Sequence, residues 1–262
     1  MIESFTVGEL LETTLATAVV ATIAMTVTAV ISRRIGKVGI VDITWGIGLN
    51  AIAVVCAVLG GDRRGWLLVG PVAVWGLRLS WYIFQRSRGQ GEDPRYLKLL
   101  DGGGFRVAVR KVFVIQGLAL WFVALPVQTA AVWDVAWWWP VWVGLALWLV
   151  GVVFETVGDT QLAAYKRDPD RGPVMDRGLW AWSRHPNYFG DACVWWGIWL
   201  AGGLASGWLP ALLSVPAPIA MTYFLVYATG ARPLEQTMRQ RPGYPEYAAR
   251  TSMIFPLPPK RP

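Results

Sequence analysis

Residues 39–60 read GIVDITWGIGLNAIAVVCAVLG and contain a single charged residue, Asp42. A helix of about 20 mostly apolar residues spans the hydrocarbon core of a bilayer, which is about 30 Å thick. This stretch is therefore predicted to cross a membrane. Similar apolar runs fill most of the chain, and they predict about seven spans, near residues 9–31, 39–60, 66–85, 112–132, 141–163, 190–208 and 209–229.

The composition supports the same reading. Of the 262 residues, 55% are hydrophobic and 16% are charged, whereas soluble domains are typically about 25% charged. We find neither a polar linker between two cores nor an internal repeat. The sequence thus predicts an all-α polytopic integral membrane helical bundle, with residues 1–262 forming one transmembrane domain.

The basic residues predict the orientation. All but Arg63, Arg64 and Arg78 of the 24 Lys and Arg residues fall on one side of these spans. Because basic loops stay in the cytoplasm, the N-terminus is predicted outside and the C-terminus in the cytoplasm. We expect a bacterial inner (plasma) membrane protein, with membrane lipids rather than nucleic acid as its partner despite the net charge of +7. Residues 1–14 include three glutamates (Glu3, Glu9 and Glu12) and no basic residue, unlike a signal peptide, so the first span is expected to stay attached.

Several kinds of site are not indicated by the sequence. Cys56 and Cys193 lie in apolar runs, and His185 is the only histidine, so neither a disulfide framework nor a metal site is predicted. We find no P-loop, dinucleotide-binding fingerprint or nucleophile elbow. The candidate chemistry therefore lies elsewhere in the chain.

Ionisable residues within the predicted spans are the first candidates, because such residues are costly in a bilayer. They fall in the cytoplasmic halves of the spans, at Asp42, Arg78, Glu155, Asp159 and Asp191. Residues four apart share one helix face, as Glu155 and Asp159 do. We expect these groups to line one polar cavity open to the cytoplasm. The alternative is structural: a carboxylate pairs with Arg78 to hold two helices together.

Two predicted cytoplasmic segments, residues 89–96 and 176–191, mix basic, aromatic and amide side chains. Arginine binds phosphates through paired hydrogen bonds, so such a surface suits a nucleotide cofactor. The alternative is that the basic residues contact anionic lipid headgroups.

Segment 178–191, GLWAWSRHPNYFGD, resembles the C-terminal motif of the steroid 5-alpha-reductase superfamily (the 3-oxo-5-alpha-steroid 4-dehydrogenase C-terminal domain). The resemblance is to a bacterial branch of uncharacterised function, and it covers roughly residues 35–258. It continues through VDITWG at 41–46, WGLRL at 75–79, GEDPRY at 91–96 and RPGYPEY at 241–247.

This resemblance implies a seven-helix membrane enzyme of lipid metabolism. Such an oxidoreductase takes NADPH from the cytoplasm and reduces a carbon–carbon double bond conjugated to a ketone in a steroid-like or other apolar lipid. The cofactor motifs concentrate in residues 155–250. The residues that match the family's cofactor positions are Asp159, Asn187 and Asp191, with Glu155, Lys166 and Trp182 beside them; Arg184, His185, Tyr188, Glu235, Tyr244 and Tyr247 complete the wall by position.

The catalytic part departs from the family. Steroid reductases use a Gln-Glu pair and a Tyr to polarise the ketone, and no Gln-Glu dipeptide occurs here. A hydrogen-bond donor is needed where negative charge develops on the ketone oxygen. Arg78, Tyr82 or a protonated Asp42 is predicted to supply it. The loop residues expected to close over the cofactor are Glu92, Asp93, Arg95 and Tyr96.

A second family shares the C-terminal pattern. The isoprenylcysteine and phospholipid methyltransferases also have an Arg-His-Pro-x-Tyr motif with a glutamate downstream, which residues 184–188 and Glu235 match. They use S-adenosylmethionine. Two alternatives to the reductase thus stay open: a membrane methyltransferase and a non-enzymatic lipid-binding protein.

Overall fold

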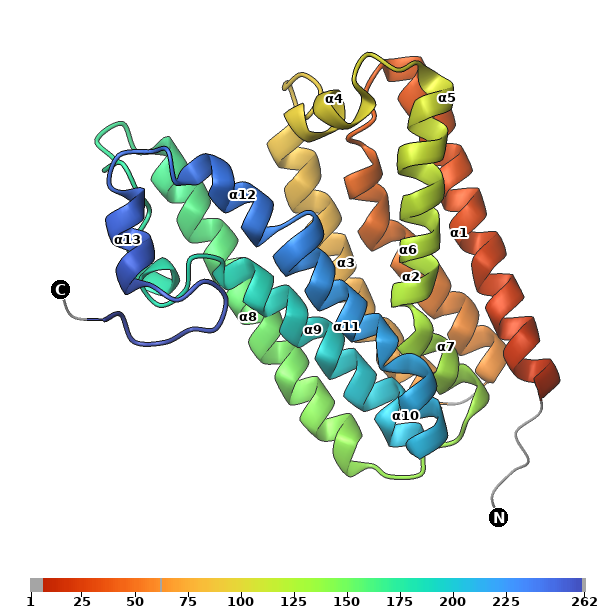
Figure 1. Cartoon of the computed structure of the whole chain (residues 1–262). Coiled ribbons are helices and arrows are strands. Elements are labelled where there is room, and N and C mark those ends of the chain that lie inside the picture. The colour runs from red at the N-terminus through yellow and green to blue at the C-terminus, as the bar shows by residue number, and fades with distance from the viewer. Residues whose placement is uncertain (1–6, 62, 261–262) are drawn as a thin grey trace. The chain divides into compact units, whose positions relative to one another are not determined.

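The computed structural model describes residues 7–61 and 63–260 (Figure 1). Within these ranges the regular elements are helices, with one isolated β-bridge between Ser183 and Ser252. The predicted all-α fold is confirmed. Glu3 and Arg261, which entered the sequence predictions, lie outside the described residues.

The chain divides into two compact units, each built from two parts of the sequence. The first unit comprises Met1–Val141 and Ala201–Ala217, and the second comprises Trp142–Leu200 and Pro218–Pro262. The prediction of one domain over the whole chain stays a prediction.

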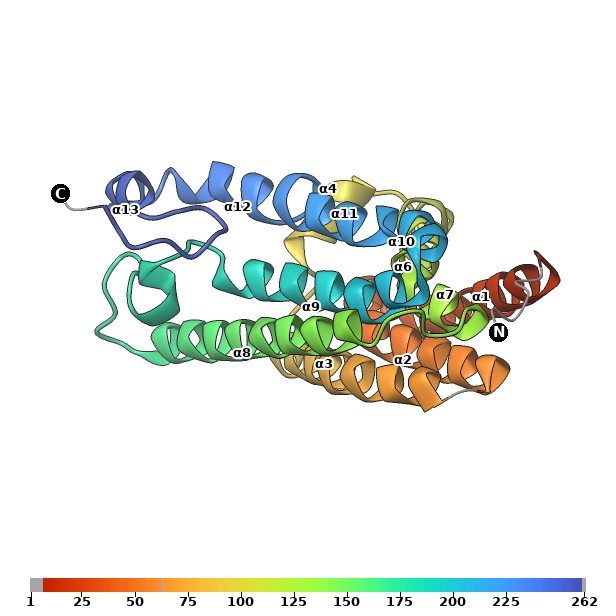
Figure 2. The same ribbon diagram turned by 90° about the horizontal axis from the view of Figure 1, so that it is seen from below.

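The first unit is built mainly of long helices that run side by side, with short helices at their ends (Figures 1 and 2). Its elements are α1 (Val7–Ile35), α2 (Val41–Gly60), α3 (Arg63–Ser87), α4 (Pro94–Leu100), α5 (Phe105–Ala108), the π-helix η1 (Val109–Phe113), α6 (Val114–Val123), α7 (Leu125–Val132), the 3-10 helix η3 (Leu204–Ser206) and α10 (Trp208–Ser214).

The second unit has the same all-helical character. Its elements are α8 (Trp139–Arg167), the 3-10 helix η2 (Gly178–Ala181), α9 (Pro186–Gly202), α11 (Pro216–Tyr223), the π-helix η4 (Phe224–Ala228), α12 (Ala231–Met238) and α13 (Tyr244–Arg250). Helices α8, α9 and α11 each begin or end within three residues of a boundary between the units.

Five stretches of helix in the described residues are long and apolar enough to cross a membrane, and a sixth is added if a bent pair of helices counts as one span. Of the about seven predicted spans, five or six therefore have helices of sufficient length and apolarity, and the predicted span near residues 190–208 stays a prediction. The difference lies in α9, whose 17 residues extend about 26 Å at 1.5 Å per residue, slightly less than the hydrocarbon thickness. The five are Val7–Ile35, Val41–Gly60, Arg64–Ser87, Trp139–Arg167 and Trp208–Met238, and the bent pair is Phe105–Val123 with Leu125–Val132.

Helix α1 shows how the bundle is suited to lipid. Its buried face carries small and hydroxyl-bearing residues such as Thr17, Ala21 and Thr28, whereas Leu15 and Ile23 are 64% and 57% exposed. Packing small residues together while aliphatic side chains face outward is typical of membrane helices. The protein is thus an integral membrane protein with several apolar helices.

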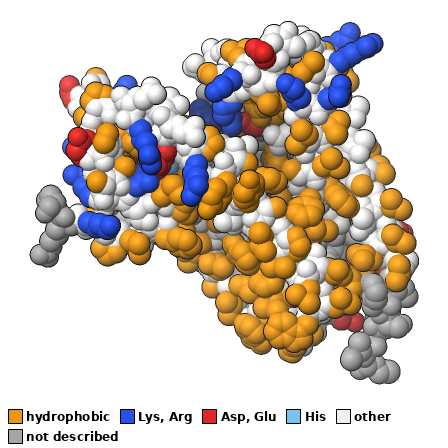
Figure 3. Space-filling model, in the orientation of Figure 1, with side chains coloured by type: hydrophobic (Ala, Val, Ile, Leu, Met, Phe, Trp, Pro, Cys, Tyr) orange, Lys and Arg blue, Asp and Glu red, His pale blue; other side chains and the backbone are white. Residues whose placement is uncertain are grey.

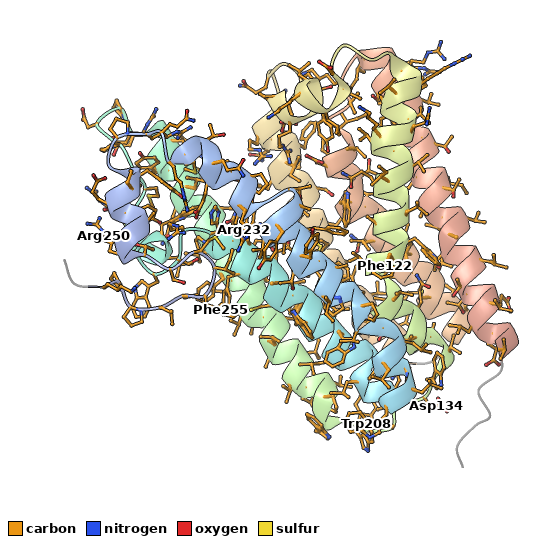
Figure 4. The ribbon with its side chains drawn as sticks, viewed as in Figure 1. Phe122, Asp134, Trp208, Arg232, Arg250 and Phe255 are labelled. Atoms are coloured by element: carbon orange, nitrogen blue, oxygen red, sulfur yellow. The ribbon has the colours of Figure 1, made fainter. Side chains whose placement is uncertain are left out.

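The first unit separates polar and aromatic ends. Lys and Arg side chains gather where α4 and α5 lie (Figure 3), and the end of the unit that carries Asp134 and Trp208 lies opposite (Figure 4). Trp208 is 70% exposed, and its ring lies 5.6 Å from that of Trp137. Tryptophans at this end fit the interfacial belt of a membrane protein.

Candidate functional site

Glycines bring α8 and α9 into close contact in the second unit. A Cβ atom added to Gly151 of α8 would lie 2.5 Å from the carbonyl oxygen of Gly190 on α9, and one added to Gly190 would lie 2.5 Å from that of Gly151. Seven residues along, a Cβ on Gly197 would lie 2.5 Å from the oxygen of Gly144. The two helices therefore pack antiparallel with almost no side chain between them.

This contact places buried polar groups of the two helices in one unit. Glu155 and Asp159 on α8 are 4% and 6% exposed, and Asp191 on α9 is 8% exposed. The Asn187 amide donates to Asp159 Oδ1 over 3.2 Å. Three carboxylates and an amide thus belong to this helix pair. The four-residue spacing predicted that Glu155 and Asp159 share one face of their helix, and likewise Asn187 and Asp191.

A second polar group centres on Glu235 of α12. Arg184 donates to both carboxylate oxygens, from Nε to Oε1 over 2.7 Å and from Nη2 to Oε2 over 3.0 Å. His185 Nε2 lies 3.1 Å from Oε1, and its ring stacks on that of Tyr188 at 5.3 Å. Arg184 also donates from Nη1 to the Ala248 carbonyl over 2.9 Å. These contacts bring segment 176–191 together with the C-terminal helices.

The same segment is anchored by its aromatic residues. The Trp180 indole donates to the Gly158 carbonyl over 3.0 Å, and the Tyr247 hydroxyl donates to the Trp180 carbonyl over 2.6 Å. The Arg184 amide donates to the Ser252 carbonyl over 2.8 Å. Tyr247 therefore has a structural role here, and its predicted cofactor contact stays a prediction.

The tyrosine hydroxyls of α13 are held neutral. Burial, together with the negative charge of Glu235, raises the pKa of Tyr244 to about 12. Burial also raises the pKa of Tyr247, with a further contribution from Tyr244. Both phenols are hydrogen-bond donors at physiological pH.

A cavity of about 720 Å³ opens beside these groups, within the same unit. It lies in the size range of ligand pockets, about 300–1,000 Å³. This cavity is not predictable from the sequence, because its wall combines the end of α8, the following loop and α13. Its charged wall residues are Asp168, Asp170, Asp176 and Glu246 with Arg171, Arg177 and Arg250.

One glycine of this cavity could have been a sequence signal. Gly178 has a φ of +60°, and a Cβ atom there would lie 2.4 Å from Nε2 of Gln161. Gln161 Oε1 in turn accepts from the Leu179 amide over 3.0 Å. Glycine is favoured at this position because its backbone conformation is left-handed, and a side chain there would also displace the Gln161 amide.

In the first unit, Asp42 joins the start of α2 to α4. Its Oδ2 accepts from Arg95 Nη2 over 2.7 Å, and its Oδ1 accepts from the Tyr96 hydroxyl over 2.5 Å. Burial and the charge of Asp42 raise the pKa of Tyr96, so the phenol stays protonated and donates. The hydrogen bonds that the Arg95 guanidinium donates to the Asp93 carboxylate are the main cause that raises the pKa of Arg95.

The preceding loop is fixed by two more carboxylates. Glu92 accepts from the backbone amides of Val38 and Gly39, the latter over 2.9 Å. Asp93 caps α4 by accepting from the Arg95 amide over 2.8 Å. Residues 89–96 are therefore tied to the connection between α1 and α2, and their predicted closure over a cofactor stays a prediction.

Arg78 and Tyr82 lie one turn apart on α3, the helix whose Gly76 closely approaches Gly46 of α2. Nε and Nη2 of Arg78 are shielded from solvent, so the guanidinium points into the protein. The ring of Tyr82 lies 5.8 Å from the Arg86 guanidinium. Asp42, Arg78 and Tyr82 belong to the first unit and the predicted cofactor residues at 155–247 to the second; their sharing one cavity stays a prediction.

Two of the predicted cofactor residues are open to the surroundings. Trp182 is 47% exposed, and Lys166 is an exposed residue in the last turn of α8. Among the described residues, no group of three or more His, Cys, Asp or Glu side chains could hold a metal ion.

Fold and composition define the class: a polytopic helical protein of the membrane, with buried ionisable groups near the ends of its helices. The chain belongs to the family described as "Protein of unknown function (DUF1295)", whose model matches residues 28–251. No curated protein and no solved structure matches the chain significantly.

Proposed function

We propose that this protein is a membrane-embedded enzyme, an NADPH-dependent reductase of a conjugated carbon–carbon double bond in a steroid-like or other 3-oxo lipid. The observation that carries the proposal is the burial of Glu155, Asp159 and Asp191 in the tightly packed pair α8 and α9. Buried carboxylates in membrane helices are costly and mark functional sites. A bundle with only a structural role would avoid them.

The polar groups of α8 and α9 suit the donors of a nicotinamide nucleotide. The carboxamide of nicotinamide both donates and accepts hydrogen bonds. Asn187 and Asp159, which form a pair, together offer a donor and acceptors to match it. Carboxylates accept from ribose hydroxyls in many dinucleotide sites, a role for Glu155 and Asp191. Lys166 and the cavity arginines Arg171 and Arg177 would take the phosphates.

The lipid ketone needs a donor of its own. Bound NADPH would supply hydride, and negative charge would then develop on the ketone oxygen, where a positioned donor is most effective. Asp42 accepts on both oxygens from Arg95 and Tyr96, and an ion-paired carboxylate is a poor donor. Arg78 and Tyr82 therefore suit this role better than Asp42.

A second function has an observation in its favour. The cavity wall carries four carboxylates and three arginines, and one of the arginines, Arg250, is paired with Asp176 over 2.5 Å. This balance suits the cationic sulfonium of S-adenosylmethionine better than a dinucleotide with several negative charges. A lipid methyltransferase is therefore the alternative proposal.

Ligand-dependent unfolding of the purified, detergent-solubilised protein separates the two. A ligand at 100 times its Kd stabilises the folded state by about 2.7 kcal/mol. Stabilisation by NADPH alone supports the reductase, and stabilisation by S-adenosylmethionine alone replaces it with the methyltransferase. If neither ligand stabilises the protein, both proposals fail.

The Asp159→Asn variant tests the site itself. Asn keeps the size of the side chain but removes its charge. We therefore expect the apparent affinity for the stabilising ligand, obtained from the ligand-dependent unfolding, to fall at least tenfold. Asp134→Asn, in the loop before α8, is the matched control and should bind as the parent protein does. Equal affinity of both variants would remove Asp159 from the site.

A further inference from the structure

A groove in the first unit carries charge that no part of the proposed function uses. It has a volume of about 830 Å³ and is lined by residues of α1, α5 and η1 and by the glycine before α5: Arg33, Arg106, Arg110, Phe105, Val109 and Gly104. The guanidinium of Arg33 lies 5.3 Å from the centre of the Phe105 ring. We call this the α1–α5 groove.

The arginines of the α1–α5 groove differ from others in the chain. Arg95, Arg184 and Arg250 each form an ion pair with a carboxylate. Within residues 7–61 and 63–260, no carboxylate pairs with Arg33, Arg106 or Arg110, and all three are exposed. Three unneutralised guanidinium groups around one hollow attract an anion with several acceptor oxygens.

The helix surfaces leading away from the arginines are apolar. Arg106, Arg110, Val114 and Leu118 recur at every fourth residue and so follow one side of the helix that contains η1; Val114 and Leu118 are 50% and 60% exposed. On α1, exposed Val30, Val27 and Ile23 precede Arg33 at intervals of three or four residues and so share one helix side with it. These two helices contact each other along this length, so an apolar surface continues from the charged groove.

The helix wall is also irregular at this point. Residues Val109–Phe113 form a π-helix, and π-helical turns often occur at functional sites. This π-helix begins at Val109, which lines the α1–α5 groove together with Arg106 and Arg110.

From the three arginines and the apolar surface beyond them, we propose that the α1–α5 groove is a specific site for one anionic phospholipid. The phosphate lies among Arg33, Arg106 and Arg110, and an acyl chain follows the exposed aliphatic residues of α1 and α6. Basic pockets between membrane helices on the cytoplasmic side bind such lipids. A free phosphate would use the arginines but not the aliphatic track.

The test compares dioleoyl phosphatidylglycerol with dioleoyl phosphatidylcholine as bound lipids, counted by native mass spectrometry of the detergent-solubilised full chain. The triple variant Arg33→Gln, Arg106→Gln, Arg110→Gln should lose about tenfold or more in affinity for phosphatidylglycerol. The control triple Arg34→Gln, Arg88→Gln, Lys98→Gln removes the same charge from exposed positions outside the groove and should change it less than threefold.

Equal losses in the two triples would overturn the proposal, since the preference would then come from diffuse surface charge. Competition by inorganic phosphate at millimolar concentration, with no preference for the lipid, would replace the phospholipid with a free phosphate. Should a triple variant not be recovered folded, the single variants Arg33→Gln and Arg110→Gln apply the same comparison against Arg88→Gln.

Discussion

At the scale of single residues, Glu235 is the group on which a buried network depends. The side chains of Arg184 and Glu235 are 10% and 4% exposed, and His185 shares the same carboxylate. Removing one partner of a buried ion pair costs about 3–5 kcal/mol, because the other charge is left without compensation. We expect Glu235→Ala to lower the free energy of unfolding by about 3 kcal/mol, measured by chemical denaturation in detergent.

The control for this prediction is Glu246→Ala on α13, an exposed position, where we expect a change within about 0.5 kcal/mol. Replacing both partners, Arg184→Met with Glu235→Leu, should recover much of the loss, since no buried charge then remains. A Glu235→Ala protein as stable as Glu246→Ala would show that the network does not stabilise the fold.

Asp93 gives a pH-dependent effect at the same scale. Burial raises its pKa, but the hydrogen bonds from the side chain and backbone of Arg95 lower it more, so its pKa lies below the ordinary 3.8. A lowered pKa means that ionised Asp93 stabilises the folded state above about pH 4, and that this contribution is lost as pH falls through the folded pKa. We expect the melting temperature of the parent protein to exceed that of Asp93→Asn at pH 6, and the difference to vanish toward pH 2. A difference that does not change with pH would contradict the assignment.

Arg64 is a basic residue whose burial could not be predicted from its residue type alone. It is one of the few basic residues on the predicted outer side, yet it is 1% exposed. It donates to Ser206 Oγ over 2.8 Å, to the Ala130 carbonyl over 2.6 Å and to the Trp133 carbonyl. These carbonyls end α7, where a cation is favourable. Arg64 is therefore an internal cap, and its side of the membrane does not conflict with the positive-inside rule.

At the scale of helices, the contact of α8 with α9 depends on the absence of side chains. A Cβ atom at Gly151 would lie 2.5 Å and 2.7 Å from backbone atoms of Gly190 and Val194, and backbone cannot move aside as a side chain can. We expect Gly151→Ala to lower the melting temperature by several degrees. Gly70→Ala on α3 has no atom within 4 Å of the added Cβ, so it should be neutral or stabilising. Equal melting temperatures would mean that the helices are not in close contact.

The existence of the helices was predictable from the sequence, because an apolar run of about 20 residues has few other stable states in a bilayer. The division of residues 190–229 into short helices was not predictable from the sequence. Gly207 has a φ of +112° and ends η3, whereas Pro210, Pro216 and Pro218 lie within one candidate span, Trp208–Met238. A proline near the start of a helix is tolerated, so these residues mark short helices in series and not separate spans.

The candidate site was predictable only within single helices. The pairs Glu155 with Asp159 and Asn187 with Asp191 follow from a spacing of four residues. Contacts such as that of Asp42 with Arg95, 53 residues apart, depend on tertiary packing. The cavity of the second unit depends on a loop whose path no periodicity encodes, so it became visible only in the structure.

At the scale of the whole molecule, the path of the chain before α8 and after α9 indicates how often it crosses the membrane. The amides of Ala136 and Trp137, just before α8, donate to the Ala205 carbonyl over 2.8 Å and 3.1 Å, so the chain that leaves along α8 returns to the same place after α9. This connection predicts a seventh crossing by α9 despite its 17 residues, which lie at the lower end of the range for spans, about 17–25.

The crossing decides the side of the C-terminal helix. Arg250 of α13 donates to Asp176, in the loop after α8, over 2.5 Å, so α13 and that loop lie on one side of the membrane. This requires α9 to cross, and α13 is then predicted on the same side as α4. In a variant without Cys56 and Cys193, both buried, we expect a membrane-impermeant maleimide to label Asp134→Cys in intact cells, and to label Asp101→Cys and Glu246→Cys only in inverted vesicles. Labelling of Glu246→Cys in intact cells would contradict this topology and the packing of α13 against the loop after α8.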